Sequence, residues 1–253
     1  MDKIAQVLDN KLVLDEVLHL FYEIILLQRE TLGERHHETV WTMYLTAALL
    51  DRRHNLDQSL YWIYQVLVNQ IDILGEQHPA TVYIKSMIAS ALELRHDFEE
   101  SLHWFHQVLV LRRKAVGEEH PDTIGIEFAI IKVLIKKGDF DEALHWLQRI
   151  LALQERTVGE EHDGTMAIVY VVARVFEYKN DYNAALEWYR RAFIQGQRKF
   201  GEKEERTLRI ASDIARIEEH QQQQQQQRLL SLNKNAIFYY DAAAEEERWR
   251  SDA

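Results

Sequence analysis

The chain has 253 residues, 47% of them hydrophobic and 28% charged, and its formal net charge is −11. This acidic balance argues against nucleic acid and against a membrane surface as partners, because both favour a basic face. The absence of cysteine excludes disulfides, thiol nucleophiles and thiolate metal ligands, and it fits a reducing, cytoplasmic compartment.

Helix-breaking residues are scarce, with only 9 Gly and 2 Pro, which favours long helices over a turn-rich β fold. The first stretch, MDKIAQVLDNKLVLDE, carries charges throughout and lacks the apolar core of a signal peptide. Charge-free apolar runs elsewhere fall well short of the ~18 residues that a membrane span needs. We therefore expect an all-α chain without a membrane-spanning segment.

One short motif recurs five times along the chain. It reads LGERHHET at 32–39, LGEQHPAT at 74–81, VGEEHPDT at 116–123, VGEEHDGT at 158–165 and FGEKEERT at 200–207. Its glycines are 42 residues apart at every step, and a fixed period of this length indicates a stacked repeat. These glycines are Gly33, Gly75, Gly117, Gly159 and Gly201.

Each repeat is predicted to hold two helices, because its apolar residues recur with a helical period. In residues 123–158, Thr123 is expected to cap the first helix and Gly138 to end it in a left-handed conformation. His54, His96 and Asn180 take the place of Gly138 elsewhere, and these residue types tolerate positive φ. In chain order the predicted helices are 14–32, 39–53, 56–74, 81–95, 98–116, 123–137, 140–158, 165–179, 182–200 and 205–220.

Small residues in the first helices precede small residues in the second helices by twelve positions. Ala47 and Ser59 form one such pair, and Ala173 and Ala185 another. This pattern resembles the tetratricopeptide repeat, and the 42-residue period with its G-E-x-H-P-x-T junction resembles the arrays of kinesin light chains. It is also similar to the C-terminal arrays of fungal nucleotide-binding receptor proteins. The resemblance covers residues 1–220 and implies a right-handed α-solenoid whose first helices line a concave, protein-binding face.

The resemblance is incomplete at positions that matter for ligands. Kinesin light chains carry cargo-binding asparagines at one position of the first helix. That ladder is missing here, where the matching residues are Leu45, Met87, Ala129, Val171 and Asp213. No phosphate-binding G-x-x-x-x-G-K-[ST] motif occurs either, so the nucleotide-binding machinery of the fungal receptors is absent from this sequence.

Two groups of residues raise the question of metal or enzyme chemistry. The repeated histidines His36, His78, His120 and His162 are separated by whole helix pairs, which is too far for shared metal ligands at ~2 Å. A cap or junction contact is the favoured interpretation. Solvated surface is favoured for two further sets, Glu99 with His103 and His106, and Glu142 with His145. No catalytic signature is present, so we expect a non-catalytic chain with no cofactor and no metal.

The predicted site is the face of the first helices, which is rich in the aromatic, Met and Arg residues that protein interfaces favour. The alternative is that these side chains pack between repeats or against a C-terminal segment folded back. The predicted groove residues are Trp41, Tyr44, Leu45, Tyr83, Ser86, Met87, Phe128, Lys132, Tyr170 and Arg174.

The predicted organisation is one solenoid over residues 1–220 and a tail over 221–253. The repeat units are about 1–33, 34–75, 76–117, 118–159 and 160–201, with a capping helix at 202–220. Seven glutamines at 221–227 extend that helix or fray into a tether, and the remaining tail is expected to be weakly ordered.

The predicted function is a scaffold or adaptor that binds a partner protein or peptide in the groove. One alternative is a regulatory sensor, in which a peptide or small ligand changes the curvature of the solenoid. The other is an accessory enzyme that uses scattered His and Glu side chains.

Overall fold

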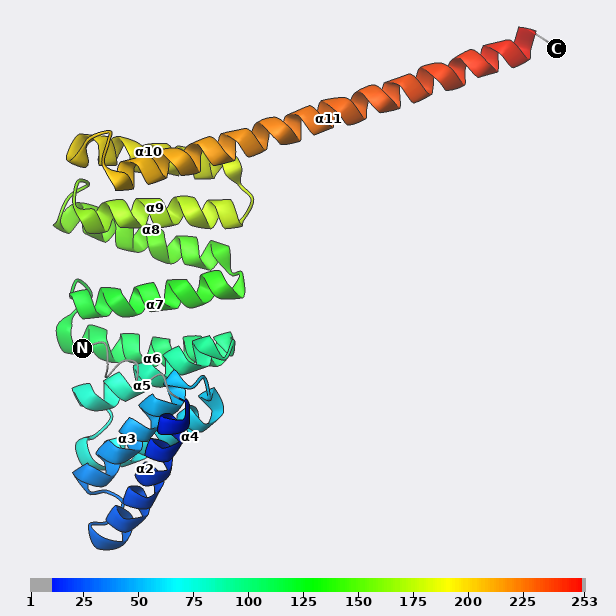
Figure 1. Ribbon diagram of the computed structural model, residues 1–253. Helices are drawn as coiled ribbons and strands as arrows, with labels where there is room; N and C mark the ends of the chain where they lie inside the picture. Colours follow the sequence, from blue (N-terminus) through cyan, green and yellow to red (C-terminus); the bar gives the residue numbers. More distant parts are fainter. Residues whose placement is uncertain (1–10, 252–253) are drawn as a thin grey trace. The chain divides into compact units, whose positions relative to one another are not determined.

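The computed structural model describes residues 11–251 of the backbone and the side chains of residues 14–230. This part of the chain forms ten α-helices and no strand (Figure 1), which confirms the all-α prediction. The helices are α2 (Lys11–Thr31), α3 (His37–Arg52), α4 (Leu56–Leu74), α5 (Pro79–Leu94), α6 (Phe98–Val116), α7 (Pro121–Lys137), α8 (Phe140–Thr157), α9 (Asp163–Tyr178), α10 (Tyr182–Phe200) and α11 (Glu205–Ser251).

The chain divides into two compact units, an N-terminal unit of Met1–Trp146 and a C-terminal unit of Leu147–Ala253. The division falls within α8. The predicted boundary after residue 220 stays a prediction, and α11 crosses that position as one helix that includes all seven glutamines. Within the described residues, none of the helices combines the length and apolar character that crossing a membrane requires.

The recurring motif joins the second helix of one repeat to the first helix of the next. Gly117 has φ 94° and follows the last residue of α6, as predicted. The N-cap of α7 is His120, whose Nδ1 accepts the backbone N–H of Asp122 at 3.1 Å. His36, His78 and His162 cap α3, α5 and α9 in the same way, which confirms the cap interpretation of these histidines.

The prediction that Thr123 caps α7 is wrong. The first helix begins two residues earlier, at Pro121, and Thr123 lies inside its first turn. The Thr123 hydroxyl instead donates to the carbonyl oxygen of Gly117 at 2.7 Å. The other end of this helix is as expected, since Gly138 has φ 94° in the left-handed region. His54, His96 and Asn180 also have positive φ, so the three predicted substitutes for Gly138 are confirmed.

Helix pairs of the N-terminal unit meet at their small residues. The buried hydroxyl of Ser59 on α4 donates to the carbonyl of Ala47 on α3 at 2.9 Å, and Ser101 on α6 does the same to Ala89 on α5 at 2.7 Å. Because these side chains are small, the helix backbones approach closely, and apolar residues on either side form one core that includes Met43.

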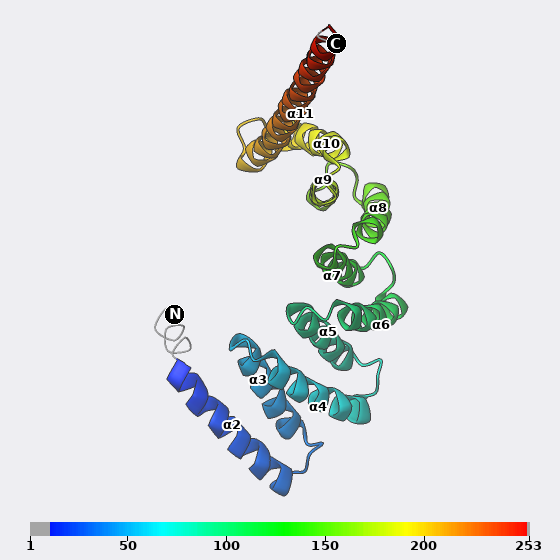
Figure 2. The same ribbon diagram turned by 90° about the vertical axis from the view of Figure 1, so that its right-hand side faces the viewer.

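The C-terminal unit packs α10 against both α9 and α11. Ala173 on α9 and Ala185 on α10 are fully buried, so this helix pair also meets at small residues. Ile210 and Ile217 are the buried apolar residues among the side chains of α11 that the structure describes. Figure 2 shows the same helix continuing beyond α9 and α10 toward the C-terminus.

Candidate partner-binding pockets

Three of the predicted groove residues line one pocket of 420 Å³ in the N-terminal unit. The pocket lies between α3, α4 and α5. The ring of Trp41 stacks on that of Tyr44, with centroids 5.2 Å apart and planes at 22°. Trp41 and Tyr83 are 59% and 51% exposed, so both rings are available to a ligand. The complete lining is His37, Val40, Trp41, Tyr44, Val66, Gln70, Ile73, Leu74, Ala80, Tyr83 and Ile84.

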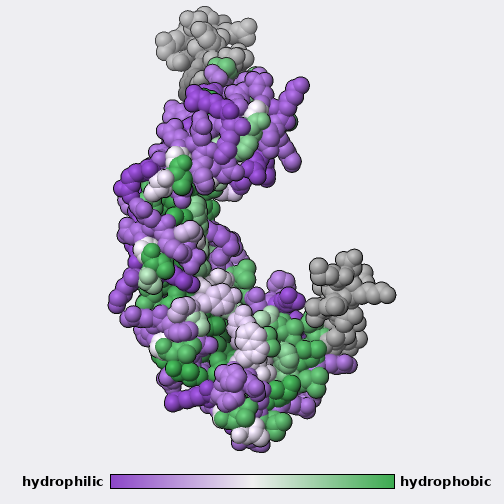
Figure 3. All heavy atoms as spheres, turned by 90° about the vertical axis from the view of Figure 1, so that its left-hand side faces the viewer, coloured by the Kyte–Doolittle hydropathy of each residue, from purple (hydrophilic) through white to green (hydrophobic). Residues whose placement is uncertain are grey.

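This aromatic pocket contains no Asp, Glu, Lys or Arg. Its polar side-chain groups are two phenol hydroxyls, an indole N–H, an imidazole and an amide. Burial raises the pKa of Tyr44, and a hydrogen bond with Tyr83 raises it further. The lining therefore has no carboxylate, ammonium or guanidinium group and suits an apolar or aromatic group. Figure 3 shows hydrophobic side chains, in green, gathered in the lower half of the view, over the N-terminal unit.

The other predicted residues of this unit lie outside the pocket lining. Leu45 and Met87 are half-buried, and Met87 packs against the apolar core. Ser86 donates its hydroxyl to the backbone carbonyl of Tyr83 at 2.6 Å. These residues therefore extend the face of the first helices beside the pocket, and part of their surface serves the core.

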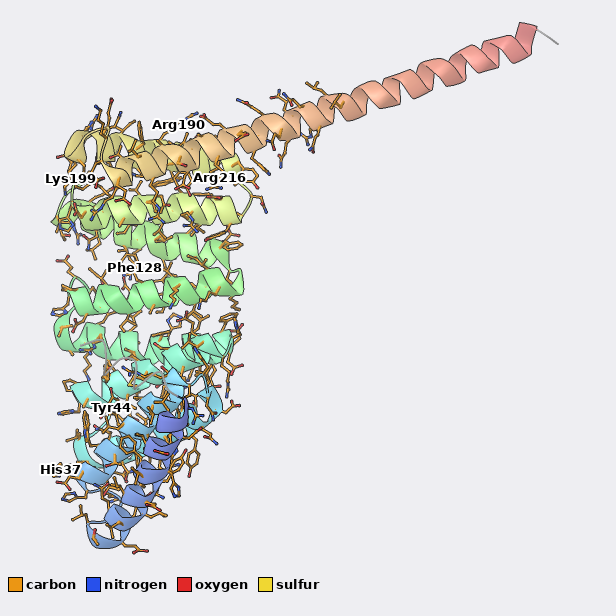
Figure 4. The ribbon with its side chains drawn as sticks, viewed as in Figure 1. His37, Tyr44, Phe128, Arg190, Lys199 and Arg216 are labelled. Atoms are coloured by element: carbon orange, nitrogen blue, oxygen red, sulfur yellow. The ribbon has the colours of Figure 1, made fainter. Side chains whose placement is uncertain are left out.

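Phe128 and Lys132 lie on α7, where Figure 4 labels Phe128. Phe128 is half-buried. The Nζ atom of Lys132 lies 2.9 Å from Oε1 of Glu93 on α5, so this cation already has a partner within its own unit.

The C-terminal unit holds a second pocket, of 310 Å³, which contains the predicted residue Tyr170. Burial raises the pKa of Tyr170, and its hydroxyl donates to Asp213 at 2.9 Å. The predicted residue Arg174 is not in the lining and contacts the ring and hydroxyl of Tyr178 instead. The lining of this pocket is Asp163, Met166, Ala167, Tyr170, Gly196, Phe200, Arg206, Thr207, Arg209 and Ile210.

The second pocket carries charges that the first one lacks. Arg206 lies 3.6 Å from Asp163, and its guanidinium also sits over the ring of Phe200. Arg209 makes no ion pair among the described residues. The floor remains apolar, with Met166 and Ile210, so this basic pocket combines guanidinium groups with a hydrophobic base.

The two pockets occupy the same place in the repeat. Adding 126, which is three periods of 42, takes each residue of the aromatic pocket except Val66 and Ile73 to a residue of the basic pocket. Tyr44 and Tyr170 are counterparts and keep the same side chain. At other lining positions the chemistry differs; for example, Trp41 corresponds to Ala167 and Tyr83 to Arg209. One repeat frame thus presents two different linings.

The sequence prediction did not include the pocket residues that the second helices and α11 contribute. Ile73 and Leu74 close the aromatic pocket from the end of α4, and Phe200 closes the basic pocket from the end of α10. Arg206 and Arg209 enter from α11. The 42-residue register could have indicated Arg206 and Arg209, because they are the counterparts of Ala80 and Tyr83 in the aromatic pocket.

The residues considered for metal chemistry have other surroundings. Glu99 is exposed and pairs with Lys137, and His103 is hydrogen-bonded to Gln107 at 2.9 Å. Burial beside Trp146 lowers the pKa of His106. Among the side chains that the structure describes, no three His, Asp or Glu residues are grouped as they would be around a metal ion.

Comparisons with known proteins agree with this architecture. Tetratricopeptide-repeat family models match residues 81–122 and 126–193. A Podospora anserina structure described as a kinesin light chain with nearly identical TPR-like repeats is similar, with a TM-score of 0.66 and 18% identity. The similarity covers 79% of this chain and 94% of that one. No curated protein sequence matches the chain.

Two further solved structures share the fold. BtubC (BKLC) from P. vanneervenii has a TM-score of 0.54 at 13% identity, over 81% of this chain and 87% of that chain. The apo form of RapI has a TM-score of 0.63 at 13% identity, over 83% of this chain and 55% of RapI. The chain therefore spans about half the length of RapI.

The helix pairs, their small-residue contacts and these similarities define an α-solenoid of tandem repeats. Residues 81–122 and 126–193 match tetratricopeptide-repeat models, and the fold is similar to that of the kinesin-light-chain-like repeat array from Podospora anserina. Such repeats generally act as non-catalytic scaffolds and generally bind protein or peptide partners.

Proposed function

We propose that this chain is a scaffold that binds a partner protein or peptide on the exposed face of its first helices, with the aromatic pocket as the main anchor. The observation that carries the proposal is the grouping of Trp41, Tyr44 and Tyr83 around one 420 Å³ pocket whose lining holds no Asp, Glu, Lys or Arg. Exposed aromatic side chains beside an apolar hollow are typical of interface positions that supply most of the binding energy.

The chemistry of the pocket indicates what it would take from a partner. An apolar or aromatic side chain of a peptide would stack on Trp41 and cover the aliphatic wall formed by Ile73 and Leu74. Aromatic contacts of this kind contribute about 0.5–1.5 kcal/mol each beyond the area they bury. In the C-terminal unit, Tyr170 and Arg209 would form a separate contact with different preferences.

The test is a binding measurement with substituted chains. The wild-type chain is first used to capture partners from its native cells, and the captured partner is then purified and titrated against the variants. We expect Tyr44→Ala and Tyr83→Ala to weaken binding by about ten-fold or more each, because each removes an anchor. Tyr170→Ala tests the contribution of the C-terminal unit.

The matched control is Tyr61→Ala, which removes an exposed tyrosine of α4 that lies outside the pocket lining. Circular dichroism must show that every variant keeps its helical content. Undiminished binding by folded Tyr44→Ala and Tyr83→Ala chains would show that the aromatic pocket is not the anchor.

A further inference from the structure

The first helix of the described structure, α2, has an apolar stripe that nothing in the described residues covers. Ile24 is 39% exposed and Leu27 is 60% exposed. The counterparts of Ile24 in the other second helices are all buried, with Val66, for example, only 1% exposed. The repeat register therefore marks Ile24 as a position that is buried in the other repeats and exposed, among the described residues, in α2.

In the other repeats, a first helix covers the position that corresponds to Ile24. Val66 packs in a core with Val40 and Met43, which belong to α3, the first helix of the same repeat. By register, α2 is a second helix, and it packs against α3 of the following repeat. Its exposed stripe therefore corresponds to the surface on which a first helix packs in the other repeats, and we call this surface the seat. The first helices α3, α5, α7 and α9 have 16 or 17 residues.

The charges beside the stripe define what kind of helix would fit. Glu16, Glu23 and Glu30 are seven residues apart on α2, so they form one line next to Leu20 and Leu27. All three are exposed. Glu23 contacts His19 at 3.3 Å, while Glu16 and Glu30 make no ion pair among the described residues. An acidic line at the edge of an apolar seat favours a partner with basic residues there.

We propose that the uncovered stripe of α2, bounded by Glu16, Glu23 and Glu30, docks an amphipathic α-helix of another protein that carries Lys or Arg along one edge of its apolar face. This helix occupies the position that a first helix takes in the other repeats. A second copy of α2 fits less well, because an antiparallel pair would set the two acidic lines on the same side. The surface is separate from the aromatic pocket, so the proposal does not depend on the proposed function.

The experiment uses the absence of cysteine in the natural chain, which makes an introduced thiol a selective reporter. Leu27→Cys places it in the seat. Leu26→Cys is the matched control, because Leu26 is 59% exposed on the same helix and its counterparts Val68 and Val110 are exposed as well. Both variants are labelled with a thiol reagent in the full chain.

The ligand in this experiment is a synthetic 17-residue amphipathic helix with Leu along one face and Lys along one edge. A second peptide carries Glu in place of every Lys. We expect the Lys peptide to slow labelling of the Leu27→Cys variant by about ten-fold and to leave the Leu26→Cys variant unchanged. The Glu peptide should protect neither variant, and added salt should weaken the protection given by the Lys peptide.

Charge reversal provides the second arm. The triple variant Glu16→Lys, Glu23→Lys, Glu30→Lys should prefer the Glu peptide over the Lys peptide.

Equal protection by both peptides, or equal protection at both positions, would overturn the proposal. If the Leu27→Cys variant is protected without peptide at every concentration, the chain's own residues cover the seat. Protection that grows with chain concentration would assign the seat to a second copy, and both results would also overturn it.

Discussion

The hydroxyl of Thr123 donates to the carbonyl oxygen of Gly117 at 2.7 Å and thereby ties α7 to the end of α6. The same bond joins Thr39 to Gly33 at 2.9 Å and Thr165 to Gly159 at 2.7 Å. Thr81 occupies the equivalent position, yet its buried hydroxyl has no hydrogen-bond partner. Threonine at one position of the repeat is thus hydrogen-bonded in some copies and buried without a partner in another, so its contribution to stability should differ.

This difference predicts opposite effects of the same substitution. Thr123→Val should lower the free energy of unfolding by about 1–2 kcal/mol, because the Gly117 carbonyl loses its donor. Thr81→Val should be neutral or slightly stabilising, because it replaces an unpaired buried hydroxyl with a methyl group. Urea titrations followed by circular dichroism measure both. A loss of stability from Thr81→Val as large as that from Thr123→Val would contradict the assignment.

Two glycines of the N-terminal unit predict a second contrast. Gly117 has φ 94° and ψ 170°, a region that only glycine occupies readily. Gly117→Ala should therefore cost about 1–3 kcal/mol, although a methyl group would meet no atom there. Gly125 lies within α7 with open space around it, so Gly125→Ala should raise stability by up to about 1 kcal/mol. Thermal unfolding of the two single variants should move in opposite directions.

Glu93 forms an ion pair that depends on pH. Its side chain is 4% exposed, and Oε1 lies 2.7 Å from Lys136 Nζ and 2.9 Å from Lys132 Nζ. Burial alone would raise the pKa of Glu93, but its bonds to Lys136 and Lys132 outweigh burial and lower the pKa below the ordinary value. Glu93→Gln should therefore reduce stability at pH 7 by about 1–3 kcal/mol, as expected when a bond to a charged group is lost.

The lowered pKa fixes the sign of the pH effect. An acid whose folded pKa is depressed stabilises the fold fully above its unfolded pKa of about 4.3, and this stabilisation is lost as the pH falls through the folded value. The difference between wild type and Glu93→Gln should be constant from pH 6 to 8 and shrink below about pH 4.3. Glu99→Gln, an exposed control that pairs with Lys137, should change stability by less than about 0.5 kcal/mol.

A buried tyrosine in the C-terminal unit is expected to contribute to the stability of the fold through its hydroxyl group. The Tyr189 side chain is fully buried, and its hydroxyl donates to Oε2 of Glu177 at 2.8 Å. Tyr189→Phe keeps the ring and removes this bond, so it should cost about 1 kcal/mol. Tyr61→Phe changes an exposed ring on α4 and should fall within about 0.5 kcal/mol of wild type. Equal melting temperatures for Tyr189→Phe and wild type would show that the bond contributes nothing.

The sequence predicted the second helices more accurately than the first helices. The ranges 56–74, 98–116 and 182–200 agree with α4, α6 and α10 at both ends, because a glycine closes each of them at a fixed step. The first helices α3, α5, α7 and α9 begin two residues before the predicted start, whereas α11 begins at residue 205 as predicted. Threonine is a preferred N-cap, but the motif also offers a histidine three residues earlier, and it is that imidazole which accepts the backbone N–H.

The candidate site was also predicted only in part, because its lining depends on how the helices pack against one another. Helical periodicity placed Trp41, Tyr44 and Tyr83 on one exposed face, and the structure groups them around one pocket. Counting along a single helix cannot supply Ile73 and Leu74, which arrive from the second helix of the repeat. The partner-binding role of the ten predicted residues stays a prediction that the binding measurements must decide.

The equivalence of the aromatic and basic pockets separates the residues that hold a repeat together from those that meet a ligand. The glycine, histidine and small-residue positions recur in almost every copy, whereas positions 41, 83, 125, 167 and 209 carry Trp, Tyr, Gly, Ala and Arg. New recognition chemistry can therefore evolve, or be installed by design, at one column without altering how the helices stack. Placing Trp at 167 and Tyr at 209 would give the C-terminal pocket the exposed aromatic pair of the N-terminal one, while Arg206 and Asp163 would keep its charged side chains.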